Sequence, residues 1–278
     1  MKINKNIFLA KYTTFRIGGL AKYFLEAKNR EEIIKAVKFA KSKKLPYFIL
    51  GSGSNILVSD KGFNGVVIKI TASRIIKNYN IIKADAGVKL SALLNFCLKN
   101  NLSGLEWLAG IPGTAGGAIY GNAGAFGHSM AELVQEVKIL NNKLHDLKFS
   151  YRDSVFKKNK QIILSIKLKL KKASQKAIKE KIKKYLQQKK ATQPLNYPSA
   201  GCIFKNPNKK PAGYLIDQCG LKGRKIGQAQ ISQKHANFIV NLGKAKAIDV
   251  KKLINLAKKE VKAQFNIDIK EEIQYLGF

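Results

Sequence analysis

Two loops of small residues are the first features of this sequence that could support chemistry. Leu50-Gly51-Ser52-Gly53-Ser54-Asn55 follows an apolar run, and a longer loop extends from Ala109 to Ala118 and again over 121–125. Glycine permits positive φ and close backbone approach, and successive backbone N–H groups in such turns form an anion-binding concavity. A tight structural turn would explain the first loop alone equally well. Two separated neutral loops favour a bulky diphosphate-containing cofactor lying against the backbone.

Several other site types are disfavoured by the same residues. The loops lack the dinucleotide fingerprint GxGxxG and the P-loop pattern with its Lys-Ser/Thr. The three cysteines fit no metal motif and no disulfide framework, so we expect no metal and a reducing compartment, the cytoplasm. The charge-free stretch 107–127 contains seven glycines and Pro112 without a continuous apolar run, so no membrane insertion is expected.

The charge of the chain raises the question of a polyanionic partner. The 278 residues include 52 Lys+Arg against 17 Asp+Glu, a formal net charge of +35. Only five of the basic residues are arginine, the residue that reads guanine edges bidentately and stacks on bases. We therefore interpret the charge mainly as lysine spread over the surface and expect no specific nucleic-acid partner. A basic polyanion-binding protein remains the alternative.

Alternating and helical patterns indicate the elements that must position the loops. Helices are predicted over 30–44, 89–100 and 248–265, the last with an apolar stripe from Val250 to Val261. The apolar face of 89–100 is predicted at Leu90, Leu93, Leu94 and Cys97. Strands are predicted over 47–50, 65–70, 80–84 and 161–170, and the last ends in an alternation of Ile166, Leu168 and Leu170 with Lys167 and Lys169. The very basic segment 171–192 is predicted as a helix and is the best candidate for a domain boundary.

Short segments carrying a family resemblance run in order almost from end to end. They are 13–19 (TTFRIGG), 50–55 (LGSGSN), 58–60 (VSD), 104–114 (GLEWLAGIPGT), 122–125 (NAGA), 151–154 (YRDS), 198–207 (PSAGCIFKNP), 220–223 (GLKG), 235–238 (HANF) and 272–277 (EIQYLG). In this order they resemble the UDP-N-acetylenolpyruvoylglucosamine reductases, flavoenzymes that make UDP-N-acetylmuramate for peptidoglycan. The ordered set is specific, whereas any one segment would not be.

The resemblance implies an α+β fold with two domains. An FAD-binding domain of the vanillyl-alcohol-oxidase (PCMH) type would cover 1–172, as two α/β subdomains at about 1–70 and 71–172. A basic connecting helix, 173–192, would lead to a smaller α+β substrate-binding domain, 193–278, whose tail returns Glu272 to the active site. Only 49 residues separate Arg152 from Cys202, which resembles the short, type II-like form of the family. A monomer is expected.

The implied reaction is a two-step hydride transfer. NADPH reduces non-covalently bound FAD, and the flavin N5 hydride then adds to the vinyl carbon of UDP-N-acetylglucosamine enolpyruvate. A cation must stabilise the developing enolate, and an acid must protonate the adjacent carbon. A related FAD-dependent oxidase or dehydrogenase of small alcohols is the alternative enzyme.

Three residues match the catalytic positions of the family. Arg152 suits a substrate carboxylate because its guanidinium can bind bidentately, and it is one of the few arginines in a lysine-rich chain. Cys202 stands where the family usually carries the proton-donating serine, and we expect its thiol to be the acid. A buried inert cysteine is the alternative. Glu272 matches the catalytic glutamate of the family.

The remaining expected site residues bind the cofactor or the substrate. Ser52 departs from the glycine usual in the family. The cofactor-binding residues are Gly51, Ser52, Gly53, Ser54, Asn55, Pro112, Gly113, Thr114, Gly117, Ala118, Asn122, Ala123 and Gly124. The substrate-binding residues are Tyr151, Lys205, Asn206 and His235.

Overall fold

The computed structural model describes residues 1–141, 143–144, 147–207 and 210–278. Contacts divide the chain into two compact units, each with segments that are distant in sequence. Unit 1 comprises Met1–Ile3, Leu25–Ser52 and Val67–Lys189. Unit 2 comprises Asn4–Phe24, Gly53–Val66 and Lys190–Phe278.

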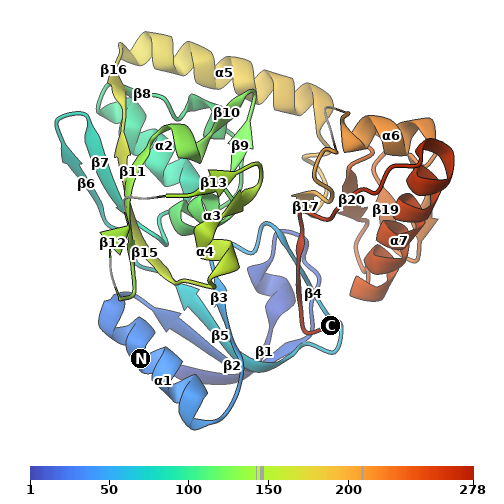
Figure 1. Ribbon diagram of the computed structural model, residues 1–278, viewed down its shortest axis with the longest axis horizontal. Helices are drawn as coiled ribbons and strands as arrows, with labels where there is room; N and C mark the ends of the chain where they lie inside the picture. Colours follow the sequence, from blue (N-terminus) through green and yellow to red (C-terminus); the bar gives the residue numbers. More distant parts are fainter. Residues whose placement is uncertain (142, 145–146, 208–209) are drawn as a thin grey trace. The chain divides into compact units, whose positions relative to one another are not determined.

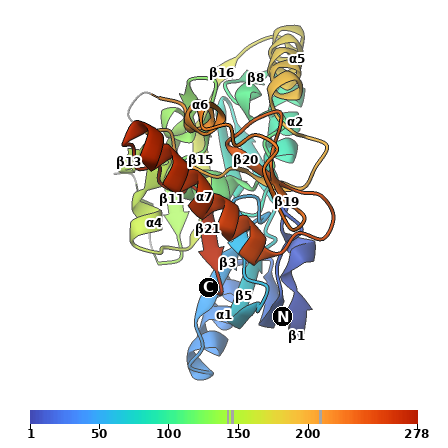
Figure 2. The same cartoon turned by 90° about the vertical axis from the view of Figure 1, so that its right-hand side faces the viewer.

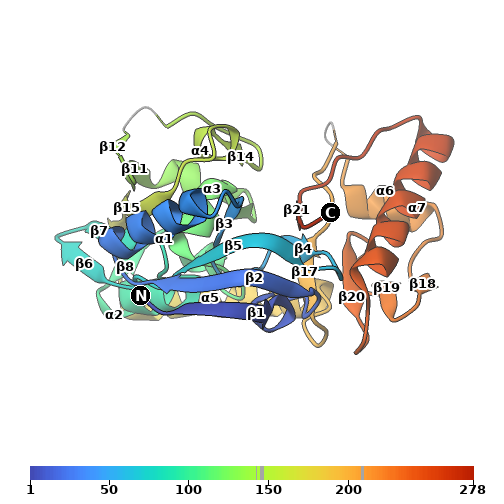
Figure 3. The same ribbon diagram turned by 90° about the horizontal axis from the view of Figure 1, so that it is seen from below.

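A four-stranded sheet near the N-terminus has the order β1-β2-β5-β3 (Figure 3). Its strands are β1 (Ile3–Phe8), β2 (Leu20–Ala27), β3 (Tyr47–Leu50) and β5 (Phe63–Ile70). Helix α1 (Arg30–Ser42) begins where the side chain of Asn29 accepts a hydrogen bond from Glu32 N. The predicted strands 47–50 and 65–70 and the helix near 30–44 are therefore confirmed within a few residues.

The second sheet lies wholly in unit 1 and is antiparallel, with the order β12-β11-β15-β7-β6 (Figure 1). Its strands are β6 (Ile75–Asn78), β7 (Ile81–Asp85), β11 (Val134–Ile139), β12 (Lys143–Leu144) and β15 (Ile163–Lys169). The predicted alternation is present in β15, because Ile166 and Leu168 are buried while Lys169 is exposed.

Short elements of unit 1 carry its loops. Helix α2 (Leu90–Lys99) buries the predicted face of Leu90, Leu93, Leu94 and Cys97. Burial raises the pKa of Cys97 to about 12, which leaves an inert packing thiol. The others are β8 (Leu102–Ser103), η2 (Glu106–Leu108), α3 (Ala115–Tyr120), β9 (Gly124–Ala125), β10 (His128–Ser129), η3 (Met130–Glu132), β13 (Phe149–Ser150), β14 (Asp153–Ser154), α4 (Val155–Lys158) and β16 (Lys171–Lys172).

Helix α5 (Gln175–Thr192) is the expected basic helix, and all but its last three residues belong to unit 1. Ile178 is buried, and Lys189 is only 3% exposed despite its charge. The Lys189 ammonium donates hydrogen bonds to the carbonyls of Trp107 (3.3 Å) and Ala109 (2.6 Å). The helix is thus anchored to the loop that precedes the second glycine segment.

The buried Lys189 gives a testable pH dependence. Burial lowers its pKa from 10.5 to about 8. Between these values the unfolded chain holds more protons at this side chain than the folded chain, so folding stability rises with pH. Relative to Lys189→Met, we expect the wild-type free energy of unfolding to increase on the order of 1 kcal/mol from pH 7 to pH 9.5. Denaturant titrations at both pH values measure it. Lys183→Met, at an exposed position of α5, should show no such change, and a flat difference for Lys189→Met would contradict the prediction.

Unit 2 contains an antiparallel sheet of order β17-β20-β19-β18, against which α7 packs, and α6 packs against α7 (Figure 2). Its strands are β17 (Ser199–Cys202), β18 (Lys225–Ile226), β19 (Ala229–Ile231) and β20 (Phe238–Asn241), and the helices are α6 (Ala212–Gln218) and α7 (Ala247–Phe265). The predicted α7 stripe is buried. Strand β21 (Gln274–Leu276) pairs in parallel with β4 (Ile56–Val58), and η1 (Leu9–Tyr12) completes the N-terminal part.

The contacts of unit 2 join segments from both ends of the chain. Phe15, Ile17 and Leu57 belong to the same hydrophobic core as Ile203 and the α7 stripe. Thr14 also donates a hydrogen bond to the Ser199 carbonyl (2.7 Å). Two N-terminal segments, 4–24 and 53–66, therefore pack with the C-terminal part of the chain. None of the described helices has the length and apolarity needed to cross a membrane.

Candidate active site

The two glycine loops meet in unit 1. A Cβ atom on Gly51, directly after β3, would lie 2.6 Å from Thr114 Oγ1. Thr114 is buried and caps α3, because its Oγ1 accepts a hydrogen bond from Gly117 N (3.3 Å). The first loop therefore requires glycine at position 51 so that its backbone can rest against the cap of the second loop.

Adding a methyl group at Gly51 tests this contact. Gly51→Ala places its Cβ 2.6 Å from Thr114 Oγ1, so one loop must move. Overpacking of this kind costs about 1–3 kcal/mol, and we expect FAD to bind about ten-fold more weakly or worse. The flavin content of the purified protein and its FAD dissociation constant measure the effect. Gly121→Ala is the matched control, because its Cβ would meet only Gly117 O at 3.7 Å. Equal flavin binding by both variants would refute the assignment.

The second loop is fixed to the five-stranded sheet and to α2 by its backbone. Leu90 N donates to Gly113 O (3.0 Å), Ala115 N to Val88 O (2.8 Å) and Gly116 N to Ala86 O (2.8 Å). A Cβ on Gly116 would lie 2.7 Å from Ala86 Cβ. These contacts occupy the backbone groups on the inner side of the loop, whereas Pro112 and Gly117 stay exposed.

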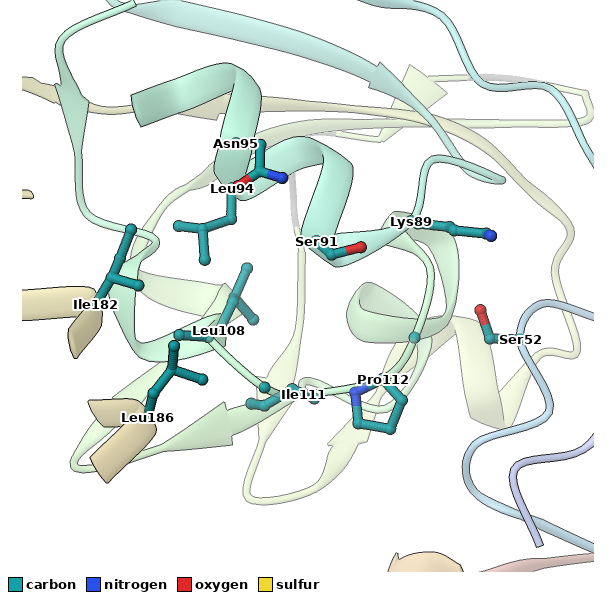
Figure 4. A pocket seen from close by; sticks show the side chains of 13 residues that line it. Ser52, Lys89, Ser91, Leu94, Asn95, Leu108, Ile111, Pro112, Ile182 and Leu186 are labelled. Atoms are coloured by element: carbon teal, nitrogen blue, oxygen red, sulfur yellow. The ribbon is translucent and has the colours of Figure 1, made fainter. Parts of the chain in front are cut away.

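A cavity of about 490 Å³ lies in unit 1 beside this loop (Figure 4). The backbone from Ala109 to Gly113 forms one wall. Ser52 and Lys89 lie at one end, and apolar side chains lie at the other (Figure 4). These apolar side chains are Leu94, Leu108, Ile182 and Leu186.

These residues fit a dinucleotide cofactor such as FAD. Two glycine-dependent backbone segments come together at Gly51 and Thr114, and the adjoining cavity has a polar end with a lysine and an apolar end. Such concave sites with a few convergent polar groups are typical of cofactor sites. Thr114, Ala118 and Asn122, which the sequence singled out, are buried, so their side chains support the loop from within.

Asn122 shows this internal role in detail. Its amide donates to Ser150 O (2.9 Å) and accepts from Ala131 N (3.1 Å). Its φ of 42° is the left-handed conformation that asparagine tolerates better than most residues. Asn122 therefore shapes the loop that presents Ala123 and Gly124.

Arg152 lies at this same loop. Tyr151 and Arg152 form the turn of the β13–β14 hairpin, and Arg152 has φ 54°. Its Nη2 donates to Gly124 O (2.7 Å), and its guanidinium carbon lies 5.3 Å from the Tyr151 ring centroid. The structure thus brings the predicted catalytic arginine to three predicted cofactor-binding residues, Asn122–Gly124.

The backbone segments that carry Cys202 and Glu272 lie side by side in unit 2. Glu272 N donates to Ile203 O (2.8 Å), Lys205 N donates to Lys270 O (2.9 Å), and Phe204 bridges Glu271. The tail therefore lies along the segment that begins at Cys202. Gly201, with φ 75°, and a register shift between Ser199 and Cys202 interrupt the pairing of β17 with β20 just before the thiol.

Asn55 and Asn237 hold these two segments from either side. Asn55 Nδ2 donates to Glu272 O (3.2 Å), and Asn55 O accepts from Gln274 N (3.0 Å). The buried Asn237 accepts from Phe204 N and donates to Phe204 O, both at 2.8 Å. Asn55, expected only as a cofactor ligand, therefore also supports the glutamate. Asn237 belongs to the family segment 235–238 (HANF), but the sequence alone indicates no role for it.

The predicted substrate residues divide between the units. Tyr151 is 53% exposed in unit 1, whereas Lys205, Asn206 and His235 lie in unit 2. Asn206 Oδ1 accepts a hydrogen bond from Ala212 N (3.0 Å) at the start of α6. Burial lowers the pKa of His235, and its Nδ1 accepts from Asn237 N (3.2 Å). A neutral His235 is thus part of the support around Cys202. No group of three potential metal ligands occurs in the part of the chain that the structure describes.

Comparisons with known proteins agree with this architecture. Residues 193–276 match the model of the UDP-N-acetylenolpyruvoylglucosamine reductase C-terminal domain, and residues 21–143 match an FAD-binding domain. A reductase of this name from Caldanaerobacter subterraneus is 41% identical, covering 99% of this chain and 94% of the relative. One from Chlamydia felis is 39% identical, covering 99% and 95%. The chain belongs to the UDP-N-acetylenolpyruvoylglucosamine reductase family.

A solved structure extends the likeness to the fold. The crystal structure of the UDP-N-acetylenolpyruvylglucosamine reductase (MurB) from Thermus caldophilus matches with a TM-score of 0.86 and 34% identity, covering 99% of both chains. The expected α+β fold, an FAD-binding domain followed by the C-terminal domain of this family, is therefore confirmed, and FAD is the cofactor of the N-terminal domain.

Proposed function

We propose that this protein catalyses the NADPH-dependent reduction of UDP-N-acetylglucosamine enolpyruvate to UDP-N-acetylmuramate. The observation that carries the proposal is the backbone pairing of the tail 270–273 with the segment 203–205, which follows Cys202 directly. Membership of the reductase family supports the same activity.

The backbone of residues 51–55 and 112–124 would hold FAD, and the bound flavin would supply hydride chemistry with NADPH as the donor. Arg152 binds the substrate carboxylate and stabilises the negative charge that develops as the vinyl group is reduced. Its hydrogen bond to Gly124 O fixes the guanidinium on the cofactor loop.

Cys202 donates the proton. As the hydride adds to the terminal vinyl carbon, the Sγ–H bond breaks and a C–H bond forms at the adjacent carbon. The resulting thiolate then regains a proton from water. Glu272, whose backbone is held by Ile203 and Asn55, places a carboxyl group beside the reacting carbon. We propose that the protein acts in the cytoplasm, a reducing compartment that suits its three free cysteines, and that it is a monomer.

Anaerobic stopped-flow spectroscopy separates the two half-reactions. NADPH should bleach the flavin absorbance of the purified yellow protein, and UDP-N-acetylglucosamine enolpyruvate should then restore it. A flavin that is bleached by NADPH but not reoxidised by this substrate would refute the proposed reaction. A colourless protein with salt-sensitive DNA binding would instead indicate the polyanion-binding alternative.

A further inference from the structure

Lys189 is a buried cation whose position no catalytic role explains. It lies in the last turn of α5, and its ammonium reaches the carbonyls of Trp107 and Ala109. The ammonium also lies 5.5 Å from the ring centroid of Phe126. Hydrogen bonds to a charged donor are stronger than neutral ones, so this side chain is a strong link between α5 and the loop.

The linked loop continues directly into the cofactor segment. Ala109 precedes Gly110, whose φ of 73° requires glycine and whose added Cβ would lie 3.2 Å from Leu186 Cδ2 and 3.5 Å from Lys189 Cδ. The rings of Phe126 and Tyr185 pack with centroids 4.7 Å apart. Three residues of α5 therefore contact two loops that flank the predicted cofactor-binding residues.

The same face of α5 closes the cavity beside the flavin loops. Leu186 and Ile182, about one and two turns before Lys189, line its apolar end together with Leu94 and Leu108 (Figure 4). Ser52 and Pro112, both expected cofactor ligands, line the rest of it. The shape of the apolar end thus depends on where α5 lies relative to the loop 108–113.

We propose that Lys189 is a positioning residue for the cofactor: by holding the Trp107 and Ala109 carbonyls it fixes α5 so that Ile182 and Leu186 form the apolar wall of a cavity that takes an apolar part of bound FAD. This inference rests on the proposed function only in assuming that the protein binds FAD. Without the ammonium, two carbonyls lose their donor in a water-poor region, and the helix and the loop move apart until water reaches them.

Three substitutions on α5 test the inference. Lys189→Met keeps the length and apolar stem of the side chain but removes its donors, whereas Lys189→Arg keeps charge and donors. Lys183→Met makes the same charge change at an exposed position of the helix. The dissociation constant of FAD is measured on full-length holoprotein from the fluorescence of flavin released on dilution. The visible flavin spectrum and the thermal midpoint are recorded in parallel.

We expect Lys189→Met to bind FAD about ten-fold more weakly, Lys189→Arg to stay within about three-fold of wild type, and Lys183→Met to be unchanged. Wild-type affinity and spectrum in Lys189→Met would overturn the inference, as would an equal loss in Lys183→Met. If Lys189→Met does not fold, Leu186→Ala provides a second test, because it removes part of the same apolar wall. Unchanged FAD affinity in that variant would also overturn the inference. None of these measurements uses NADPH or the enolpyruvyl substrate. The test of Lys189 is therefore valid even if the proposed reaction fails.

Discussion

Cys202→Ala is expected to abolish reduction of the enolpyruvyl substrate while leaving reduction of the flavin by NADPH nearly intact. The thiol supplies a proton only in the second half-reaction, and general acid catalysis contributes about 10²–10⁴-fold. The rate of flavin reoxidation by substrate should therefore fall by that factor. Stopped-flow measurement of the two half-reactions on the same sample separates the effects.

Two further variants sharpen this test. Cys202→Ser installs the residue usual in the family and should restore most of the reoxidation rate. Cys219→Ala removes a second partly buried thiol, at the end of α6, and should leave both half-reactions unchanged. An equal loss of both half-reactions in Cys202→Ala would show that Cys202 supports the fold, since β17 and the tail pack around it.

Arg152→Lys is expected to slow substrate reduction by about 10²–10³-fold, the usual cost of removing a preorganised donor from a developing negative charge. Lysine keeps the charge but loses the planar fork that binds a carboxylate bidentately. It is a milder change than truncation for the loop, because a lysine ammonium can still donate to Gly124 O, the acceptor of the present 2.7 Å hydrogen bond. Single-turnover reoxidation of the reduced flavin measures the effect.

Flavin binding is the readout that distinguishes catalysis from loop support. If Arg152 acts on the substrate, Arg152→Lys should retain its FAD with unchanged affinity and should react with NADPH at a normal rate. Arg74→Lys, at an exposed arginine of the same unit, is the control and should be silent throughout. Loss of FAD in Arg152→Lys, with an unchanged rate in the fraction that keeps its flavin, would reassign Arg152 to supporting the Asn122–Gly124 loop.

Elements that depend on local patterns could be predicted from the sequence. The apolar faces of α2 and α7 and the alternation in β15 are present as expected, because a single helix or strand must bury one face whichever partner covers it. The catalytic roles of Arg152, Cys202 and Glu272 stay predictions, drawn from the short family segments in which these residues stand.

The sequence pattern of α5 does not indicate how this helix is anchored. Its composition is typical of a solvated connecting helix, yet Ile178 is buried and Ile182 and Leu186 line the cavity of unit 1. Nothing in the sequence marks Lys189, one lysine among many, as a buried anchor. Its burial follows from the carbonyls of Trp107 and Ala109, which lie about eighty positions earlier in the chain.

The sequence by itself thus determined the local elements, the two neutral glycine loops and the residue types that chemistry requires. Only the tertiary structure decided that Gly51 meets Thr114, that Asn55 and Ile203 hold Glu272, and that 4–24 and 53–66 share a core with α7. The physical reason is the difference in sequence separation between local patterns and tertiary contacts. Periodicity and turn chemistry act over a few residues, whereas these contacts join segments tens to hundreds of residues apart and depend on how the whole chain packs.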